Sequence, residues 1–265
     1  MDKYLIWNNQ YCYHRKKNYI YFFYIIIILL SISSTNAGEF IVGNKNEFIN
    51  ALNSEDDATI IVVGTIDLQN SVETKSSNSH IIITGQDQTH SVINFTQPST
   101  GFIFNELQEI EISNISINGN VKFNGHYNIK INSVNHNGSL TTSNMNHDNQ
   151  IMIKNYHYSP DPKYSKIISI DFHGGNIDIE DSIFITKEDT KDTLIFFTGE
   201  SEEVLDNLTI KNCKFDCKYL SRALSINSGN ITIQSSSFSN AYNKDNGLII
   251  QFINIIKLII LLLYI

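Results

Sequence analysis

Asp171, His173 and Asp178 are the residues whose types and spacing come closest to a catalytic set. Hydrolysis of a glycosidic bond by acid–base catalysis needs two carboxyl groups held at a set separation, which Asp171 and Asp178 would supply. However, Asp178 alternates with Ile177 and Ile179, so it is expected to face outward from a strand. We interpret the stretch as a solvated strand face with a loop histidine, and keep the three residues as the catalytic alternative.

Metal ligation has weaker support in the sequence. Glu200, Glu202 and Glu203 follow a Thr-Gly pair and are expected to form an exposed loop rather than a calcium site. The histidines lack the i, i+4 spacing of a metal motif, and His136 is expected to be a packed core residue. We therefore predict no metal and no cofactor.

Cys213 and Cys217 lie four residues apart. An extended strand would separate them by about 13 Å, which is too far for a disulfide unless the chain bends sharply between them. We expect free, partly buried thiols.

A short sequence phrase recurs six times, and the elements that it predicts must position these residues. It reads apolar-x-apolar-x-polar-x-x-large, and its copies begin between 19 (Ile110 to Ile129) and 31 (Ile177 to Leu208) residues apart. The copies are IEISNISI (110–117), IKINSVNH (129–136), IMIKNYHY (151–158), IDIEDSIF (177–184), LTIKNCKF (208–215) and ITIQSSSF (231–238). Such repetition is typical of a coil of similar rungs.

The spacing predicts two short strands joined by a bend in each copy. The two apolar positions share one strand face, and the polar position holds residues that tolerate turn geometry. A bend there turns the next positions inward, so that the polar side chains would stack as a hydrogen-bonded ladder inside the coil. These ladder residues are Asn114, Ser133, Asn155, Asp181, Asn212 and Ser235.

The predicted fold is therefore all-β, a right-handed single-stranded parallel β-helix with a short N-terminal capping helix. A β-sandwich is the alternative, because it too has short strands with turn signals at intervals. The repeated polar position favours the coil, since a sandwich has no reason to repeat one phrase.

The predicted domain spans residues 38–246, between two apolar segments. Residues 1–37 carry a basic cluster, an apolar run and small residues, as in a secretory signal peptide, or a signal anchor if uncleaved. Residues 247–265 have three interpretations that stay open: a membrane or lipid anchor, a terminal cap of the coil, or a stretch that is not part of the natural protein. We expect a protein of the secretory pathway, extracellular or at the cell surface, and associated with the membrane if either segment is retained.

The formal net charge limits the classes of partner that the protein can bind. The 265 residues carry a formal charge of −8, and the first 37 contribute +3 from four Lys/Arg and one Asp, which leaves −11 for the rest. This acidity argues against nucleic acid as a partner. The sequons Asn94, Asn137, Asn207 and Asn230 are candidate glycosylation sites, whereas Asn114 is expected to be unmodified because of its predicted place in the ladder.

Residues 40–68 carry a family resemblance. An amphipathic segment with Glu47, Phe48, Ala51 and Leu52, in which Asn46 is expected to cap a helix, precedes the strand phrase IVVGTI (61–66). This passage resembles the opening of pectate lyases and their relatives. The resemblance implies a right-handed parallel β-helix, with calcium and a basic residue that abstracts a proton next to a uronate carboxylate.

The catalytic phrases of that family do not match. Its Trp-x-Asp-His phrase is absent, because the only tryptophan is Trp7, and Arg222 is the only arginine after the first 37 residues. We therefore predict a non-enzymatic binding or structural module that recognises carbohydrate or another surface protein. The alternative is a polysaccharide lyase or hydrolase acting on a uronate-containing glycan, with calcium as the cofactor that the resemblance would imply.

Overall fold

The computed structural model describes residues 38–54, 57–74, 80–105, 107–125, 127–164, 169–187, 193–199, 206–241, 250–253 and 257–264. All of them belong to one compact unit, Ala37–Ile265. The predicted signal segment, residues 1–37, lies outside the described residues.

The larger of two sheets has 15 strands, in two sets. The strands of the first set contain the apolar start of each rung: β1 (Gly38–Val42), β2 (Ala58–Val62), β5 (His80–Gly85), β8 (Glu109–Asn118), β10 (Asn128–His136), β12 (Gln150–Lys154), β15 (Asn176–Glu180), β18 (Asn207–Lys211), β21 (Asn230–Ser239) and β23 (Lys257–Tyr264). The second set consists of short strands beyond the bend: β3 (Thr65–Leu68), β6 (Val92–Phe95), β13 (His157–Tyr158), β16 (Ile183–Ile185) and β19 (Lys214–Asp216).

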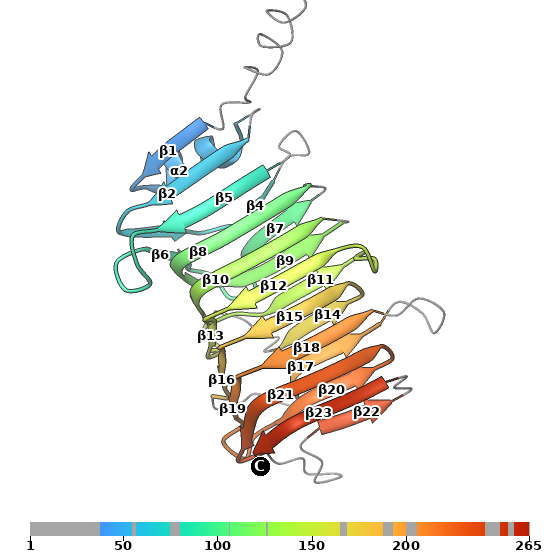
Figure 1. Cartoon of the computed structure of the whole chain (residues 1–265). Coiled ribbons are helices and arrows are strands. Elements are labelled where there is room, and N and C mark those ends of the chain that lie inside the picture. Colours follow the sequence, from blue (N-terminus) through green and yellow to red (C-terminus); the bar gives the residue numbers. More distant parts are fainter. Residues whose placement is uncertain are drawn as a thin grey trace, which may run out of the picture. The chain divides into compact units, whose positions relative to one another are not determined.

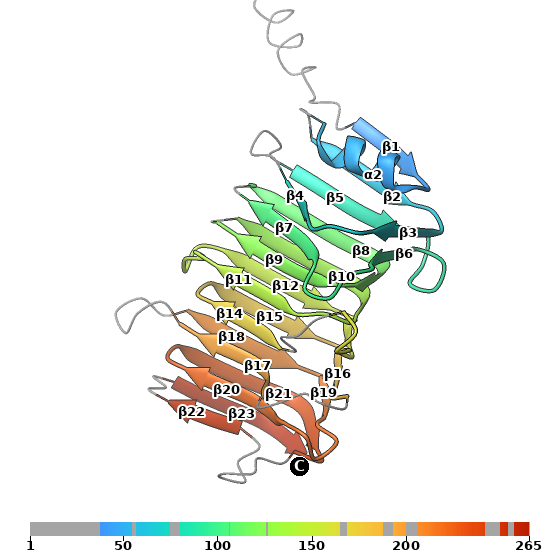
Figure 2. The same cartoon turned by 180° about the vertical axis from the view of Figure 1, so that it is seen from behind.

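The smaller sheet has eight strands: β4 (Val72–Glu73), β7 (Gly101–Asn105), β9 (Asn120–Asn124), β11 (Leu140–Ser143), β14 (Ile170–His173), β17 (Thr193–Thr198), β20 (Arg222–Asn227) and β22 (Ile250–Ile253). From β5 onward, one or two strands of the larger sheet are followed along the chain by one strand of the smaller sheet, so β8 pairs with β10 while β9 pairs with β11 (Figures 1 and 2). Every recorded pairing of the described strands is parallel, for example β15 with β18. The antiparallel sandwich is therefore not observed, and the topology is compatible with the predicted parallel solenoid.

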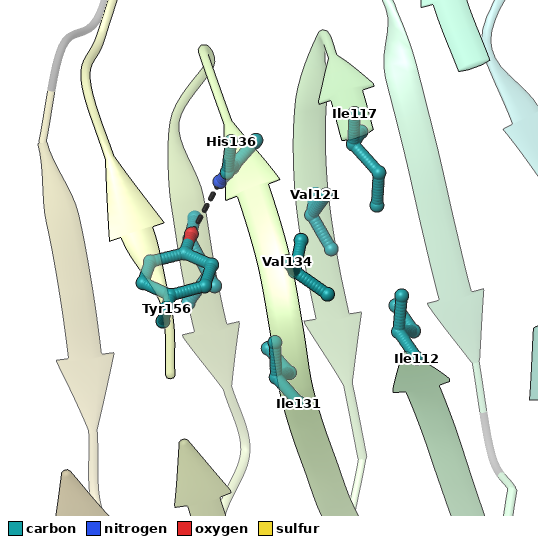
Figure 3. A pocket seen from close by; sticks show the side chains of 8 residues that line it. Ile112, Ile117, Val121, Ile131, Val134, His136 and Tyr156 are labelled. Atoms are coloured by element: carbon teal, nitrogen blue, oxygen red, sulfur yellow. Dashed lines mark hydrogen bonds between the residues drawn. The ribbon is translucent and has the colours of Figure 1, made fainter. Parts of the chain in front are cut away.

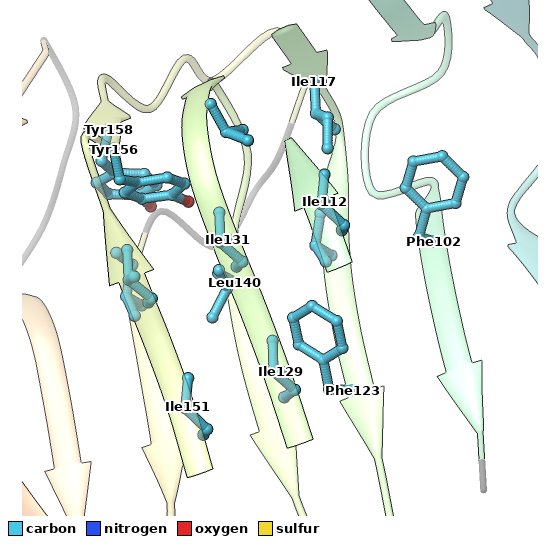
Figure 4. Close-up of a cluster of buried hydrophobic side chains, with 14 of the residues drawn as sticks. Phe102, Ile112, Ile117, Phe123, Ile129, Ile131, Leu140, Ile151, Tyr156 and Tyr158 are labelled. Carbon is cyan, nitrogen blue, oxygen red and sulfur yellow. The ribbon is translucent and has the colours of Figure 1, made fainter. Parts of the chain in front are cut away.

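Alternation of side chains builds the core between the sheets. The apolar positions of each copy are buried and aligned from strand to strand, as in the row Ile112, Ile131, Ile153. β-branched isoleucine suits this environment because it packs well on a pleated surface. Figure 4 shows such side chains facing one another across the interior, including Ile131 and Leu140 from opposite sheets. The predicted inward positions beyond the bend are also confirmed: Ile115, Val134, Tyr156, Ser182, Cys213, Ser236, Ile117, His136, Tyr158, Phe184, Phe215 and Phe238.

Aromatic rings form a column at the last position of the phrase. Phe184, Phe215 and Phe238 are stacked, with ring centroids 4.7 and 4.6 Å apart and planes within 11°. Tyr158 continues the column at 6.3 Å from Phe184. The parallel register repeats one position at each strand spacing, which explains why identical residues meet face to face.

The bend at the polar position is confirmed. All six residues have a left-handed backbone, with φ between 49° and 56°, a region that asparagine and aspartate tolerate better than most residues. The predicted location of their side chains inside the coil is wrong, because each is exposed or partly exposed. The left-handed residue shifts the strand alternation by one position, so its own side chain points out and the next one points in. The six are Asn114, Ser133, Asn155, Asp181, Asn212 and Ser235.

A substitution at Asn155 tests the corner geometry. Asn155→Val is expected to be about 1–2 kcal/mol less stable than Asn155→Gly, because a β-branched side chain strains a left-handed backbone and glycine does not. Both variants lose the hydrogen bond from the Asn155 side-chain amide to Asn132 (3.2 Å). The difference between their free energies of unfolding in denaturant therefore isolates the backbone effect. Equal stability of the two variants would contradict the assignment.

The predicted helix before the first rungs is present as α2 (Lys45–Leu52), the one helix within the described residues. Its cap is Asn44 rather than the predicted Asn46, because the Asn44 side chain accepts the N–H groups of residues 46 and 47. Phe48, Ala51 and Leu52 are buried, and the Phe48 ring lies 5.8 Å from Phe102 of β7. The helix thus packs its apolar face onto the core.

The apolar C-terminal segment contributes strands to both sheets. β22 pairs with β20, and β23 pairs with β21, both in parallel register. Within the described part of the chain, no helix is long and apolar enough to cross a membrane.

Candidate functional site

The structure brings together two of the three catalytic candidates. Asp171 and His173 both lie on β14, with Oδ2 of Asp171 3.3 Å from Nε2 of His173; Asp171 is partly exposed and His173 is exposed. Asp178 lies on β15 in the other sheet. The residues aligned with Asp171 on the neighbouring strands are Thr141 and Phe196, so neither supplies the second carboxylate that glycoside hydrolysis requires.

Metal ligands do not converge in the described residues, where no group of three or more His, Cys, Asp or Glu side chains is suited to hold an ion. Glu200, Glu202 and Glu203 lie outside the described residues. Cys213 and Cys217 are free, as predicted, and they are fully rather than partly buried. Burial raises the pKa of the Cys213 thiol to about 12 and that of Cys217 to about 11, which disfavours the reactive thiolate.

His136 is a core residue, also as predicted, and is 1% exposed. Its Nε2 lies 2.7 Å from the carbonyl oxygen of Gly119, and its Nδ1 lies 2.5 Å from the Tyr156 hydroxyl (Figure 3). Nε2 therefore donates to the carbonyl oxygen, and in the neutral ring Nδ1 accepts from the Tyr156 hydroxyl. Burial lowers the pKa of His136 to about 4. The adjoining cavity, about 10 Å³ and otherwise lined by apolar side chains such as Ile131 and Val134, is at the lower size limit for one water.

A surface groove of about 380 Å³, lined mainly by polar side chains, lies over β6, β8, β10 and β13. Two rows of outward side chains form its floor, at one residue per strand in each row. The first row, Ser116, Asn135 and His157, follows the strand register. The second row lies two residues further along the chain: Asn118 ends β8, and Asn137 and Ser159 directly follow β10 and β13.

One wall comes from the connection between β5 and β6. In the six phrase copies this corner is a single left-handed residue, but here residues 86–91 form a longer loop. Ser91 anchors its base, because the buried hydroxyl donates to the carbonyl oxygen of Val62 (2.8 Å) and accepts from Gln86 N–H (2.9 Å). The Ser116 hydroxyl holds its tip by donating to the Gln88 carbonyl oxygen at 2.5 Å.

Asp87 fixes the shape of this loop. Its carboxylate accepts the backbone N–H (2.8 Å) and hydroxyl (2.6 Å) of Thr89, and lies 2.8 Å from Nδ1 of His90. The Thr89 and His90 side chains lower the pKa of Asp87 well below its usual range. The groove wall at Gln88 and Thr89 is therefore held by a compact set of hydrogen bonds.

Asparagine amides brace the floor. Asn137 donates from Nδ2 to Oδ1 of Asn118 (2.7 Å), Asn118 to Asn94 (2.5 Å), and Asn94 to Asp67 (3.0 Å). A second ladder joins Asn230, Asn207 and Asn176 at the start of their strands. Hydrogen-bonded ladders therefore occur, but mainly at strand ends. At the predicted position only Asp181 and Asn212 are joined directly among the six.

The chemistry of the groove is polar and uncharged. Its lining of amides, hydroxyls, one imidazole and Val92 contains no Asp, Glu, Lys or Arg. Such groups donate to and accept from neutral polyols, and they offer no countercharge for an ionised ligand. The arrangement can hydrogen-bond an uncharged ligand through several groups at once.

The sequence carried a signal for this groove that the prediction missed. The outward positions after the bend are Ser116/Asn118, Asn135/Asn137 and His157/Ser159 in the first three copies. In the fourth and fifth copies the same positions hold Ile183/Ile185 and Lys214/Asp216. An uncharged polar cluster was thus readable on three successive rungs.

Comparison with protein-family models, with curated proteins and with solved structures finds no match for this chain.

Proposed function

We propose that this chain is an exported, non-enzymatic right-handed parallel β-helix that binds a neutral polysaccharide in the groove over β6, β8, β10 and β13. The observation that carries the proposal is the uncharged lining of the groove. Under this proposal the protein is extracellular or at the cell surface, and it associates with the membrane if a terminal apolar segment serves as an anchor. The acidic charge argues against nucleic acid.

The periodicity of the floor supports an extended polymer as the ligand. Parallel strands are spaced about 4.8 Å apart, so each row presents a polar side chain at that interval. A linear glycan lying along the direction of strand stacking meets a similar pair of side chains on each rung. Oδ1 of Asn137 and the ring of His157 have no hydrogen bond recorded within the described residues, which leaves them available to sugar hydroxyls.

Substitution of the floor tests the proposal. Asn135→Ala and His157→Ala are each expected to weaken binding of a neutral polysaccharide by roughly 3- to 10-fold, because each removes one hydrogen bond to an uncharged ligand. The double variant is expected to lose binding measurably further. Affinity electrophoresis against a panel of neutral and uronate polymers gives the relative affinities.

Thr232→Ala is the matched control, since Thr232 is an outward polar residue of β21 outside the groove. Equal loss in the control variant, or tighter binding to uronate polymers than to neutral ones, would contradict the proposal. Selective binding of a surface protein at the same floor would instead favour that class of partner.

The Asp171–His173 pair keeps the enzymatic alternative testable. Release of unsaturated or reducing ends from polygalacturonate, with or without added calcium, that is lost in Asp171→Ala or His173→Ala would establish a lyase or hydrolase and overturn the non-enzymatic assignment.

A further inference from the structure

The five sequons of the chain differ in what their side-chain amides do, and all five asparagines lie in the described residues: Asn94, Asn114, Asn137, Asn207 and Asn230. Four of them donate from Nδ2 to a side-chain oxygen on the preceding circuit, meaning the previous passage of the chain through both sheets. The distances lie between 2.5 and 3.1 Å. N-linked glycosylation attaches the glycan to this same nitrogen. Modification there would crowd or break a ladder contact.

Exposure alone does not select the site. Asn207 is exposed, yet its amide donates to Asn176 and accepts from Asn230. A glycan on Asn207 would therefore have to fit between two neighbouring amides about one strand spacing away on either side.

Asn114 is different in both respects. It is exposed at a corner with φ of 52°, and we find no hydrogen bond to its amide within the described part of the chain. The strand register places Gly85 and Ser133 beside it on the two neighbouring circuits. Gly85, which precedes the loop of residues 86–91, has no side chain, and the side chain of Ser133 is short, so neither places a long side chain beside the Asn114 amide.

We propose that the native protein carries an N-linked glycan on Asn114. The other four sequon asparagines, whose amides are hydrogen-bonded, stay unmodified: Asn94, Asn137, Asn207 and Asn230. This reverses the expectation from the sequence, which placed Asn114 inside the coil. The inference rests on the export half of the proposed function and is independent of what the groove binds.

The experiment uses the full chain, produced in eukaryotic cells and recovered from the secretory compartments or the medium. Glycopeptide mass spectrometry is expected to find a glycan on Asn114 and none on the other four sequons. Asn114→Gln is expected to lose the whole mass shift caused by glycosidase treatment. Asn207→Gln, the matched exposed control, is expected to keep it.

The failures are distinguishable. Exported protein with Asn114 unmodified, or with a ladder asparagine carrying the glycan instead, overturns the site while export stands. A chain found only in the cytosol overturns the export on which the site depends. Polysaccharide binding by unglycosylated protein made in bacteria is measured separately, so it reports on the groove alone.

Discussion

Replacing Phe215 with alanine is expected to lower the free energy of unfolding by about 3–5 kcal/mol. The ring is fully buried and stacks on Phe184 and Phe238 at 4.7 and 4.6 Å. Truncation removes two ring contacts and leaves a cavity in the middle of the column. The parallel strands on both sides hold that cavity open, because their backbone pairing prevents collapse.

Denaturant unfolding of Phe215→Ala and Phe196→Ala gives the comparison. Phe196 lies on β17 in an outward, partly exposed position, so the same truncation there is expected to cost less than about 1 kcal/mol. Similar losses in both variants would show that the aromatic column is not a special source of stability.

Acidification is expected to destabilise the protein through His136. Burial lowers the pKa of His136 from 6.5 to about 4, so the unfolded chain binds a proton in a pH range where the folded chain does not. The stability that the neutral ring provides is fully present above pH 6.5, falls as the pH drops toward 4, and then levels off. The shift corresponds to a loss of about 3 kcal/mol across that window.

Two variants isolate this effect in unfolding curves measured between pH 4 and 7. His136→Phe removes the titrating group from a position that holds phenylalanine in the last three copies, so its pH dependence is expected to be flatter. His157→Gln removes an exposed histidine and is expected to keep the wild-type slope. The groups that face His136 are Tyr156 and Tyr158, and burial raises the pKa of both hydroxyls, so neither titrates here. An unchanged slope in His136→Phe would contradict the prediction.

The repeat predicted the strands and bends because both depend on local physics. Alternation places Ile110 and Ile112 inside whatever the rest of the chain does, and a polar residue at the next turn position indicates a bend. The side of the bend on which Asn114 points depends on its backbone dihedral. The spacing allowed either direction, and the left-handed conformation at 52° decides it.

The ladders and the groove were harder to predict because they depend on register between circuits. Asn118 and Asn137 are 19 residues apart, and only the pairing of β8 with β10 makes them neighbours. The wall of the groove depends on how Asp87 folds residues 86–91, where the repeated phrase offers no template. Asp171 and Asp178, close in sequence, end on different sheets because Gly174 and Gly175, both with positive φ, turn the chain between them.

The parallel register has a consequence for how such a chain changes over evolutionary time. Each interior circuit docks only on the circuit before it and the one after it, as β10 does between β8 and β12, so energetic coupling is between nearest neighbours. Duplication or deletion of a whole circuit leaves every remaining interface with a matching partner. A shift of a single residue within a strand would instead turn its apolar side chains to solvent. Viable changes in length therefore come in whole circuits: the groove can lengthen or shorten by one circuit at a time, while its cross-section stays constant.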